Sequence, residues 1–290
     1  MGTSTLSFLE PRLTRSYNVS ANRAMQTPDY VESYNTHLAR LIEAHGRDAA
    51  MALVVGGEYS QIGILESSAL LTLGLQRRDT LVDVGCGSGR LPYELRNYLD
   101  GVFIGTDILN EALKYAAEKC ARPDWQFIPN HLPTIPVSDS TADFVTFFSV
   151  FTHLLDEDVF RFLSEAKRVA RPGGTIVFSF LDFECDSHWP VFEATVADRN
   201  PDRVINKFIS KGAIRRWSRA LGLRLEAIHD GPHPWIMLTQ PFNYLDGRRA
   251  EGVVEFGQSI AVLKTEVPNQ SSEPTPASGT SPAGQEPRLP

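Results

Sequence analysis

Two kinds of apolar pattern alternate through the middle of the chain. In one, apolar residues recur at the three- to four-residue spacing of a helix face; in the other, short runs of β-branched and aromatic residues are typical of buried strands. The expected helices are 60–75, 90–99, 110–121, 156–170 and 209–222. The expected strands are 80–85, 102–108, 125–129, 142–150, 175–181, 223–230 and 252–265.

Local signals support several of these boundaries. Asn110 and Asp156 are the kind of residue that caps a helix N-terminus, and Pro92 is tolerated in a first helical turn. The sequence RPGG at 171–174 is expected to close the helix over 156–170. Strands that alternate with helices in this way indicate βαβ units, and therefore an α/β fold with helices on both sides of a parallel sheet.

The flanking segments break this rhythm. Residues 1–58 are expected to form a flexible N-terminus followed by a helical cap, and 59–267 to form the main domain. Within it, 182–222 predicts a lid insertion and a helix, because long irregular connections inside a domain are usually functional. Residues 268–290 are rich in proline and polar residues, so we expect a disordered tail.

Composition narrows the function classes. The 290 residues carry a formal net charge of −7 and no strongly basic block, which disfavours nucleic-acid binding. The densest basic group, Arg215, Arg216 and Arg219, is interpreted as a solvated helix face. No signal peptide or membrane-length apolar run is visible, so a cytoplasmic protein without a membrane partner is expected. Cys86, Cys120 and Cys185 are widely spaced, which argues against disulfides and a zinc site; no metal is expected.

The sequence LVDVGCGSGR at 81–90 joins an expected strand to an expected helix. Its glycines at 85, 87 and 89 match neither the dinucleotide pattern, which requires a small residue where Arg90 stands, nor the phosphate-binding loop, which ends in Lys and Ser or Thr. Asp83, just ahead of the loop, disfavours a pyrophosphate and favours a cationic group.

Asp107 ends the next expected strand. A carboxylate at that position can accept hydrogen bonds from both hydroxyls of a ribose. A ligand with a ribose, no phosphate and some positive charge is indicated, and S-adenosylmethionine (SAM) has these properties.

Four segments, in order, resemble the motifs of class I SAM-dependent methyltransferases. They are the glycine loop at 81–90, FIGTDI at 103–108, the adenine-side loop and fourth strand at 127–154, and 165–180. The resemblance covers about residues 60–265 and implies a three-layer Rossmann-like fold, with a mostly parallel seven-stranded sheet and an antiparallel final strand. One departure is Asn130, which stands where the adenine-side loop usually begins with an acid.

The resemblance and the pattern together assign candidate site residues. For the cofactor, SAM (product S-adenosylhomocysteine, SAH), they are Asp83, Gly85, Cys86, Gly87, Gly89, Asp107, Ile108, Asn130, His131, Leu132 and Ser149. His153, after the fourth strand, is the candidate general base, because histidine titrates close to neutral pH. The candidate substrate-binding residues are Tyr59, Asp182 and His188.

The expected activity is methyl transfer to a small-molecule or saccharide acceptor, most plausibly at oxygen. A protein or peptide methyltransferase and a non-catalytic SAM-binding module are the alternatives, and a homodimer is left open. The sequence FSVFTH at 148–153 stands where amino-methylating DNA enzymes carry an Asn-Pro-Pro run, which disfavours that class. Arg90 and Asp83 count against a NAD-dependent oxidoreductase.

Overall fold

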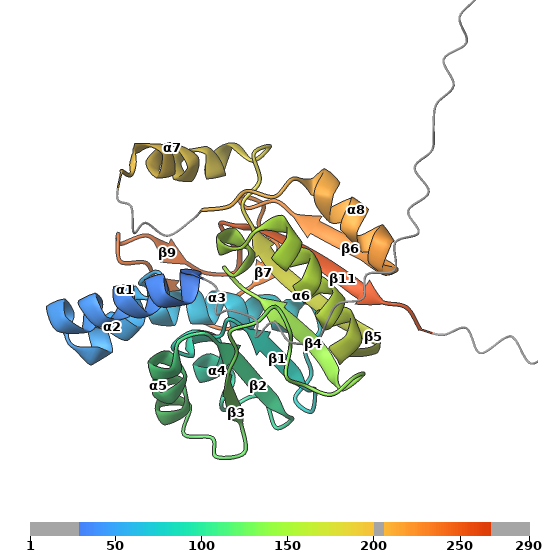
Figure 1. Cartoon of the computed structure of the whole chain (residues 1–290), viewed down its shortest axis with the longest axis horizontal. Helices are drawn as coiled ribbons and strands as arrows, with labels where there is room; N and C mark the ends of the chain where they lie inside the picture. Colours follow the sequence, from blue (N-terminus) through green and yellow to red (C-terminus); the bar gives the residue numbers. More distant parts are fainter. Residues whose placement is uncertain (1–28, 200–205, 268–290) are drawn as a thin grey trace, which may run out of the picture.

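A seven-stranded sheet forms the centre of the molecule in the computed structural model, which describes residues 29–199 and 206–267 (Figure 1). The strand order is β3-β2-β1-β4-β5-β11-β6. β11 is antiparallel to both of its neighbours, β5 and β6. All neighbouring pairs among the first five strands are parallel. The strands are β1 (Leu81–Val84), β2 (Phe103–Asp107), β3 (Gln126–Pro129), β4 (Ala142–Phe147), β5 (Ala170–Phe180), β6 (Leu223–His229) and β11 (Ser259–Thr265).

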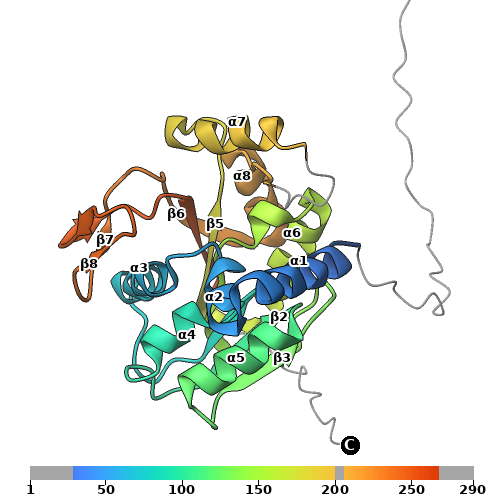
Figure 2. The same ribbon diagram turned by 90° about the vertical axis from the view of Figure 1, so that its left-hand side faces the viewer.

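Helices cover both faces of the sheet and complete the three layers that the sequence predicts (Figure 2). One face carries α3 (Tyr59–Thr72), α4 (Arg90–Leu95) and α5 (Asn110–Cys120). The other face carries α6 (Asp156–Val169) and α8 (Lys211–Leu221). The mostly parallel sheet with its antiparallel β11 confirms the expected fold class.

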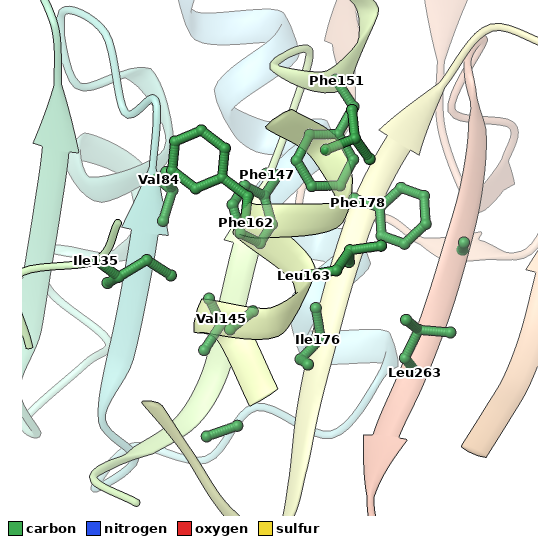
Figure 3. Packing of buried hydrophobic residues seen from close by; sticks show 14 of the residues in the cluster. Val84, Ile135, Val145, Phe147, Phe151, Phe162, Leu163, Ile176, Phe178 and Leu263 are labelled. Atoms are coloured by element: carbon green, nitrogen blue, oxygen red, sulfur yellow. The ribbon is translucent and has the colours of Figure 1, made fainter. Parts of the chain in front are cut away.

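The largest buried cluster lies between α6 and the sheet. Figure 3 shows Phe162 and Leu163 of α6 against Phe147 of β4 and Phe178 of β5. The Phe147 ring lies 4.6 Å from Phe151 and 5.8 Å from Phe162, centroid to centroid. Large aromatic side chains supply much of the apolar area that stabilises such a core. This packing fixes the carboxyl end of β4, where a site is expected.

Two helices precede the sheet domain and pack on α5. They are α1 (Asp29–His45) and α2 (Arg47–Leu53). Leu38 and Met51 share a buried cluster with Leu109, Ala112 and Tyr115. Arg47 also pairs with Glu111 at 2.9 Å and with Glu118 at 2.6 Å. The N-terminal helices are therefore attached to the domain at the carboxyl end of β2.

The helix ends differ in detail from the sequence predictions. The N-cap positions of α5 and α6 are Leu109 and Leu155, without a side-chain cap bond, so the capping roles expected of Asn110 and Asp156 are wrong. Both are the first residues inside their helices, where acidic or polar side chains still suit the helix dipole. Helix α4 ends at Leu95, short of the expected residue 99, and β5 already begins at Ala170.

The expected strand over 252–265 is two separate elements. Gly257, with φ of 92°, bends the chain between β10 (Val253–Val254) and β11. β10 pairs with β7 (Ile236–Met237), and β8 (Phe242–Asn243) pairs with β9 (Arg249–Ala250). These hairpins pack on α3 through Ile236 and Phe242, an insertion that the sequence pattern did not reveal.

The segment predicted as a lid contains η2 (Asp186–His188) and α7 (Trp189–Ala197). α7 contributes no buried residue, and Figure 1 shows it set apart from the sheet. Both ends of the segment are attached to the domain: His188 bonds Gly257, and the Lys207 amide donates to the Thr152 carbonyl at 2.6 Å. A lid role stays a prediction. The expected tail at 268–290 and the first 28 residues lie outside the described residues.

A buried ion pair joins α3 to α4. Arg90 donates from Nε (3.0 Å) and Nη2 (2.5 Å) to Oε1 of Glu66, whose side chain is 2% exposed. Arg90 Nη1 also donates to the Val55 carbonyl, so one guanidinium links the sheet domain to the turn that follows α2.

Loss of this arginine is expected to destabilise the protein strongly. Arg90→Met leaves Glu66 buried without its partner, which costs about 3–5 kcal/mol of unfolding free energy. The matched control is Arg77→Met, because the Arg77–Asp100 pair is exposed and contributes less than about 1 kcal/mol. Urea unfolding measures both. Equal effects of the two substitutions would contradict the structural role given to Arg90.

Candidate functional site

A cavity of about 420 Å³ opens at the carboxyl ends of β1, β2 and β4. This is within the size range of small-molecule sites, and it lies where open α/β sheets bind ligands. Ten sequence-predicted residues line it: Asp83, Gly85, Cys86, Gly87, Asp107, Ile108, Asn130, Leu132, Ser149 and His153. The fold thus brings together most of the residues that the motifs indicate.

The glycine loop forms the floor of the cavity. Gly85, Gly87 and Gly89 have φ values of 76°, 54° and 88°, a region that side chains with a Cβ rarely adopt. A Cβ on Gly87 would lie 2.5 Å from Val55 Cγ1, and one on Gly89 would lie 2.6 Å from Ala116 Cβ. Gly89 does not line the cavity; its glycine is required for packing on α5.

Asp107 is held rigidly at the end of β2. Its Oδ2 accepts the Gly87 amide at 2.8 Å and its Oδ1 accepts the Leu109 amide at 2.9 Å. Burial raises the pKa of this carboxyl, and the backbone donors oppose that effect. Each carboxylate oxygen has two acceptor sites, so both can still receive a ligand hydroxyl.

Asp83 lies deeper, at the end of β1, and is 3% exposed. Its Oδ1 accepts the Thr146 hydroxyl at 2.7 Å. Burial raises the pKa of Asp83 to about 8, and the nearby charge of Glu66 adds to that shift. Its carboxyl is therefore mostly protonated at pH 7, and a ligand cation would favour the ionised form.

Residues from α1 and from η1 (Phe151–His153) form another part of the wall. Tyr34 and His37 come from α1, and the Tyr34 ring lies edge-on to His153, 6.1 Å between centroids at 68°. Burial, together with the charge of Asp107, raises the pKa of the Tyr34 phenol. His153 thus shares the cavity with Asp107, as its candidate role requires.

Ser149 and Gln258 meet where β4 ends and β11 begins. Ser149 has a φ of 58°, and its amide donates to Ser179 Oγ at 2.7 Å. Gln258 Nε2 donates to Ser149 Oγ at 3.2 Å, whereas Gln258 Oε1 is buried and has no hydrogen-bond partner in the described part of the chain. An unsatisfied amide oxygen in a cavity wall is suited to a ligand donor.

The adenine-side loop is ordered by Asn130. Its Oδ1 accepts the Leu132 amide at 3.3 Å and its Nδ2 donates to the Thr134 carbonyl at 2.5 Å. Asn130 and Leu132 line the cavity, whereas His131 does not.

The three candidate substrate residues do not line the cavity, and each contacts other groups of the protein. Tyr59 donates to the Ser88 carbonyl at 2.9 Å. The His188 ring is 2% exposed; its Nδ1 accepts the Asp182 amide at 2.9 Å and its Nε2 bonds the Gly257 carbonyl at 3.0 Å. Asp182 is fully buried beside Lys211, 3.5 Å away. These contacts place Asp182 and His188 in a structural network at the base of the 182–208 segment.

Several polar wall residues are not among the predicted site residues, and Tyr34, His37, Glu66 and Gln258 are examples. Tyr34 and His37 are three positions apart on one helix, a spacing that could have suggested a shared polar face. Nothing in the local pattern marks Glu66 or Gln258.

No group of three metal-ligating side chains occurs within residues 29–199 and 206–267. Over the same described ranges, no helix is long and apolar enough to cross a membrane.

Comparison with known proteins agrees with this geometry. Residues 82–178, which contain the glycine loop, Asp107 and His153, match a family described as "Methyltransferase domain". This match and the fold together support a class I SAM-dependent methyltransferase, as the sequence motifs indicate.

Individual relatives of this methyltransferase are distant. Over 193 residues it is 26% identical to malonyl-[acyl-carrier protein] O-methyltransferase of Hahella chejuensis, a match that covers 65% of this chain and 65% of that protein. The magnesium protoporphyrin IX methyltransferase of Synechocystis, solved with bound SAH, has a TM-score of 0.55 at 15% identity over 82% of this chain and 98% of that one. A chain in the complex between the Haloferax volcanii Trm112 methyltransferase activator and a methyltransferase has a TM-score of 0.57 at 20% identity. This match covers 80% of the present chain and 98% of that one. At these identities the solved structures establish the fold alone.

The cavity fits SAM, the cofactor of this family. Gly85 and Gly87 bring loop backbone into the cavity lining, Asp107 retains acceptor sites for the ribose hydroxyls, and Asp83 is a buried carboxyl that is not in an ion pair within the described lining. Arg90, the cation nearest to it in the lining, is bound to Glu66.

Binding of SAM is expected to release protons. Because the pKa of Asp83 is about 8, a cationic ligand that ionises this carboxyl should expel close to one proton at pH 7. Calorimetry in buffers of different ionisation enthalpy measures the number of protons released. Asp83→Asn should reduce that number toward zero. A binding enthalpy of the wild type that is independent of the buffer would contradict this assignment.

Proposed function

We propose that this methyltransferase transfers a methyl group from SAM to an oxygen atom of a small-molecule or saccharide acceptor. The observation that carries the proposal is one cavity in which the glycine loop and Asp107 lie together with Tyr34, His37 and His153. The cofactor-binding motif and a set of polar side chains therefore line the same cavity. The Hahella chejuensis relative is itself an O-methyltransferase, which supports oxygen as the acceptor atom.

The chain's own residues have separate tasks in this proposal. When bound, SAM supplies an activated methyl group on a sulfonium. Asp107 holds the ribose, and the glycine loop lets the backbone approach closely; together they fix the direction in which the methyl group faces. Positioning of this kind accounts for a large share of the rate in a displacement reaction. His153 stands where it can accept a proton from a hydroxyl acceptor.

Two other functions predict different behaviour. A protein or peptide methyltransferase would methylate polypeptides and would not methylate small acceptors. A non-catalytic module would bind SAM without turnover. The cavity volume of about 420 Å³ favours a small acceptor. Incubation with methyl-labelled SAM and separate small-molecule, saccharide and peptide panels distinguishes the three. Failure to bind SAM by calorimetry would refute the proposal. A cytoplasmic location and a homodimer stay predictions.

Asp107→Ala is expected to weaken SAM binding by about 1–3 kcal/mol, the scale of a lost hydrogen bond to a charged group. Asp100→Ala is the matched control, because Asp100 is an exposed acid outside the cavity. Calorimetric dissociation constants measure both variants. An unchanged affinity in Asp107→Ala would remove its ribose role.

His153→Ala is expected to lower the turnover of every acceptor that the wild type methylates, while the dissociation constant for SAM stays within about twofold. Initial rates with labelled SAM and calorimetry give the two quantities. Full turnover in the variant would exclude His153 from the reaction.

A further inference from the structure

The charged groups of the cavity are distributed unevenly. In the described part of the chain, its lining contains three carboxylates, Glu66, Asp83 and Asp107, which come from α3, β1 and β2. The part formed by α1 and η1, here called the α1–η1 wall (Tyr34, His37, His153 and Leu154), contributes none. The cavity therefore has one acidic side and one side made of imidazole and phenol groups.

The acidic side is suited to a cation. Arg90 is the one Lys or Arg among the described lining residues, and its guanidinium is bound to Glu66 and to the Val55 carbonyl. The charge of Arg90 acts on Asp83, but among the described lining residues neither Asp83 nor Asp107 is in an ion pair. In the proposed function the sulfonium and ammonium groups of SAM supply a cationic partner.

The α1–η1 wall is suited to an anion. A protonated imidazole donates from both nitrogens, and a phenol that keeps its proton is a donor. Burial raises the pKa of Tyr34, which keeps its hydroxyl protonated at neutral pH. Tyr34 and His153 are in ring contact, and His37 lies one helical turn from Tyr34. Three potential donors thus lie on one part of the described lining, which contributes no carboxyl group of its own, although the charge of Asp107 acts on Tyr34.

We propose that the methyl acceptor is a carboxylate, held at the α1–η1 wall by Tyr34, His37 and His153. This inference rests on the proposed function and narrows its acceptor oxygen to a carboxylic acid. It also changes the task of His153: a carboxylate is already ionised at neutral pH, so no base is required and the imidazole binds the acceptor.

The chemistry balances without a proton acceptor. A carboxylate oxygen uses a lone pair to form the new carbon–oxygen bond to the methyl group. The carbon–sulfur bond breaks and its electron pair stays on sulfur, so the products are a neutral methyl ester and SAH. One negative and one positive charge disappear together, a reaction that a cavity shielded from water favours.

The test compares three unbranched probes of six carbon atoms each: hexanoate, hexanamide and 1-hexanol. The chain suits the apolar residues near the wall, Leu53, Val54 and Leu154. Binding of each probe to the SAH-saturated protein is measured by calorimetry at pH 7. We expect hexanoate to bind at least tenfold more tightly than either neutral probe.

Variants test whether the preference for hexanoate comes from the α1–η1 wall. The double variant His37→Gln/His153→Gln should lose the preference for hexanoate while its dissociation constant for SAH stays within about twofold, which also shows that it is folded. His45→Gln is the matched control, because His45 ends the same helix, is exposed and does not line the cavity. It should retain the preference.

Three results would overturn the inference while leaving the proposed function intact. These are no hexanoate binding to the SAH complex, equal or tighter binding of a neutral probe, and an undiminished preference in the double variant. Failure of SAH itself to bind overturns the proposed function, and this inference with it.

Discussion

The hydrogen bond from the Gly87 amide to the Asp107 carboxylate, 2.8 Å long, connects the two halves of the cofactor site. It joins the loop after β1 to the end of β2, and the parallel pairing of those strands places the two groups side by side. Gly87 has a positive φ of 54°, and Val55 packs against it so closely that a Cβ there would lie 2.5 Å from Val55 Cγ1. The floor of the cavity and the position of the N-terminal helices over it therefore depend on the same few backbone atoms.

Attachment of α1 and α2 adds a wall to the cavity at the carboxyl ends of the strands. The two helices are held by apolar packing on α5, by Arg47, and by the bond from Arg90 to the Val55 carbonyl. This arrangement places Tyr34 and His37 in the cavity with His153. Cofactor geometry comes from the Rossmann-like core, whereas the chemistry offered to the acceptor comes largely from helices that precede it.

The sequence alone predicts the parts of this site that depend on local patterns. The glycines, Asp83 and Asp107 can be predicted because strand ends and turn residues are marked by sequence signals only a few residues long. Gln258 and Glu66 reach the cavity only through tertiary packing, so no local signal marks them. Asp182 and His188 lie outside the cavity lining for the same reason: the fold places them at the base of the 182–208 segment, where His188 is hydrogen-bonded on both ring nitrogens and Asp182 lies beside Lys211. The hairpins at 236–254 were missed because each strand has only two residues.

The distribution of charged groups in the cavity links the fold to the proposed methyl transfer. Carboxylates from the core face a site for a cation, and donors from the N-terminal helices and η1 face the remaining space. Such an arrangement holds the methyl donor and the acceptor by opposite charges, so the two ligands are oriented by the walls that bind them.

A crystal structure of the complex with SAH tests the central claim most directly. The account predicts both ribose hydroxyls on the Asp107 carboxylate, the amino-acid end of SAH against the glycine loop and Asp83, and the sulfur facing the space beside Tyr34 and His153. SAH bound elsewhere, or bound with Asp107 more than a hydrogen-bond length from the ribose, would contradict it.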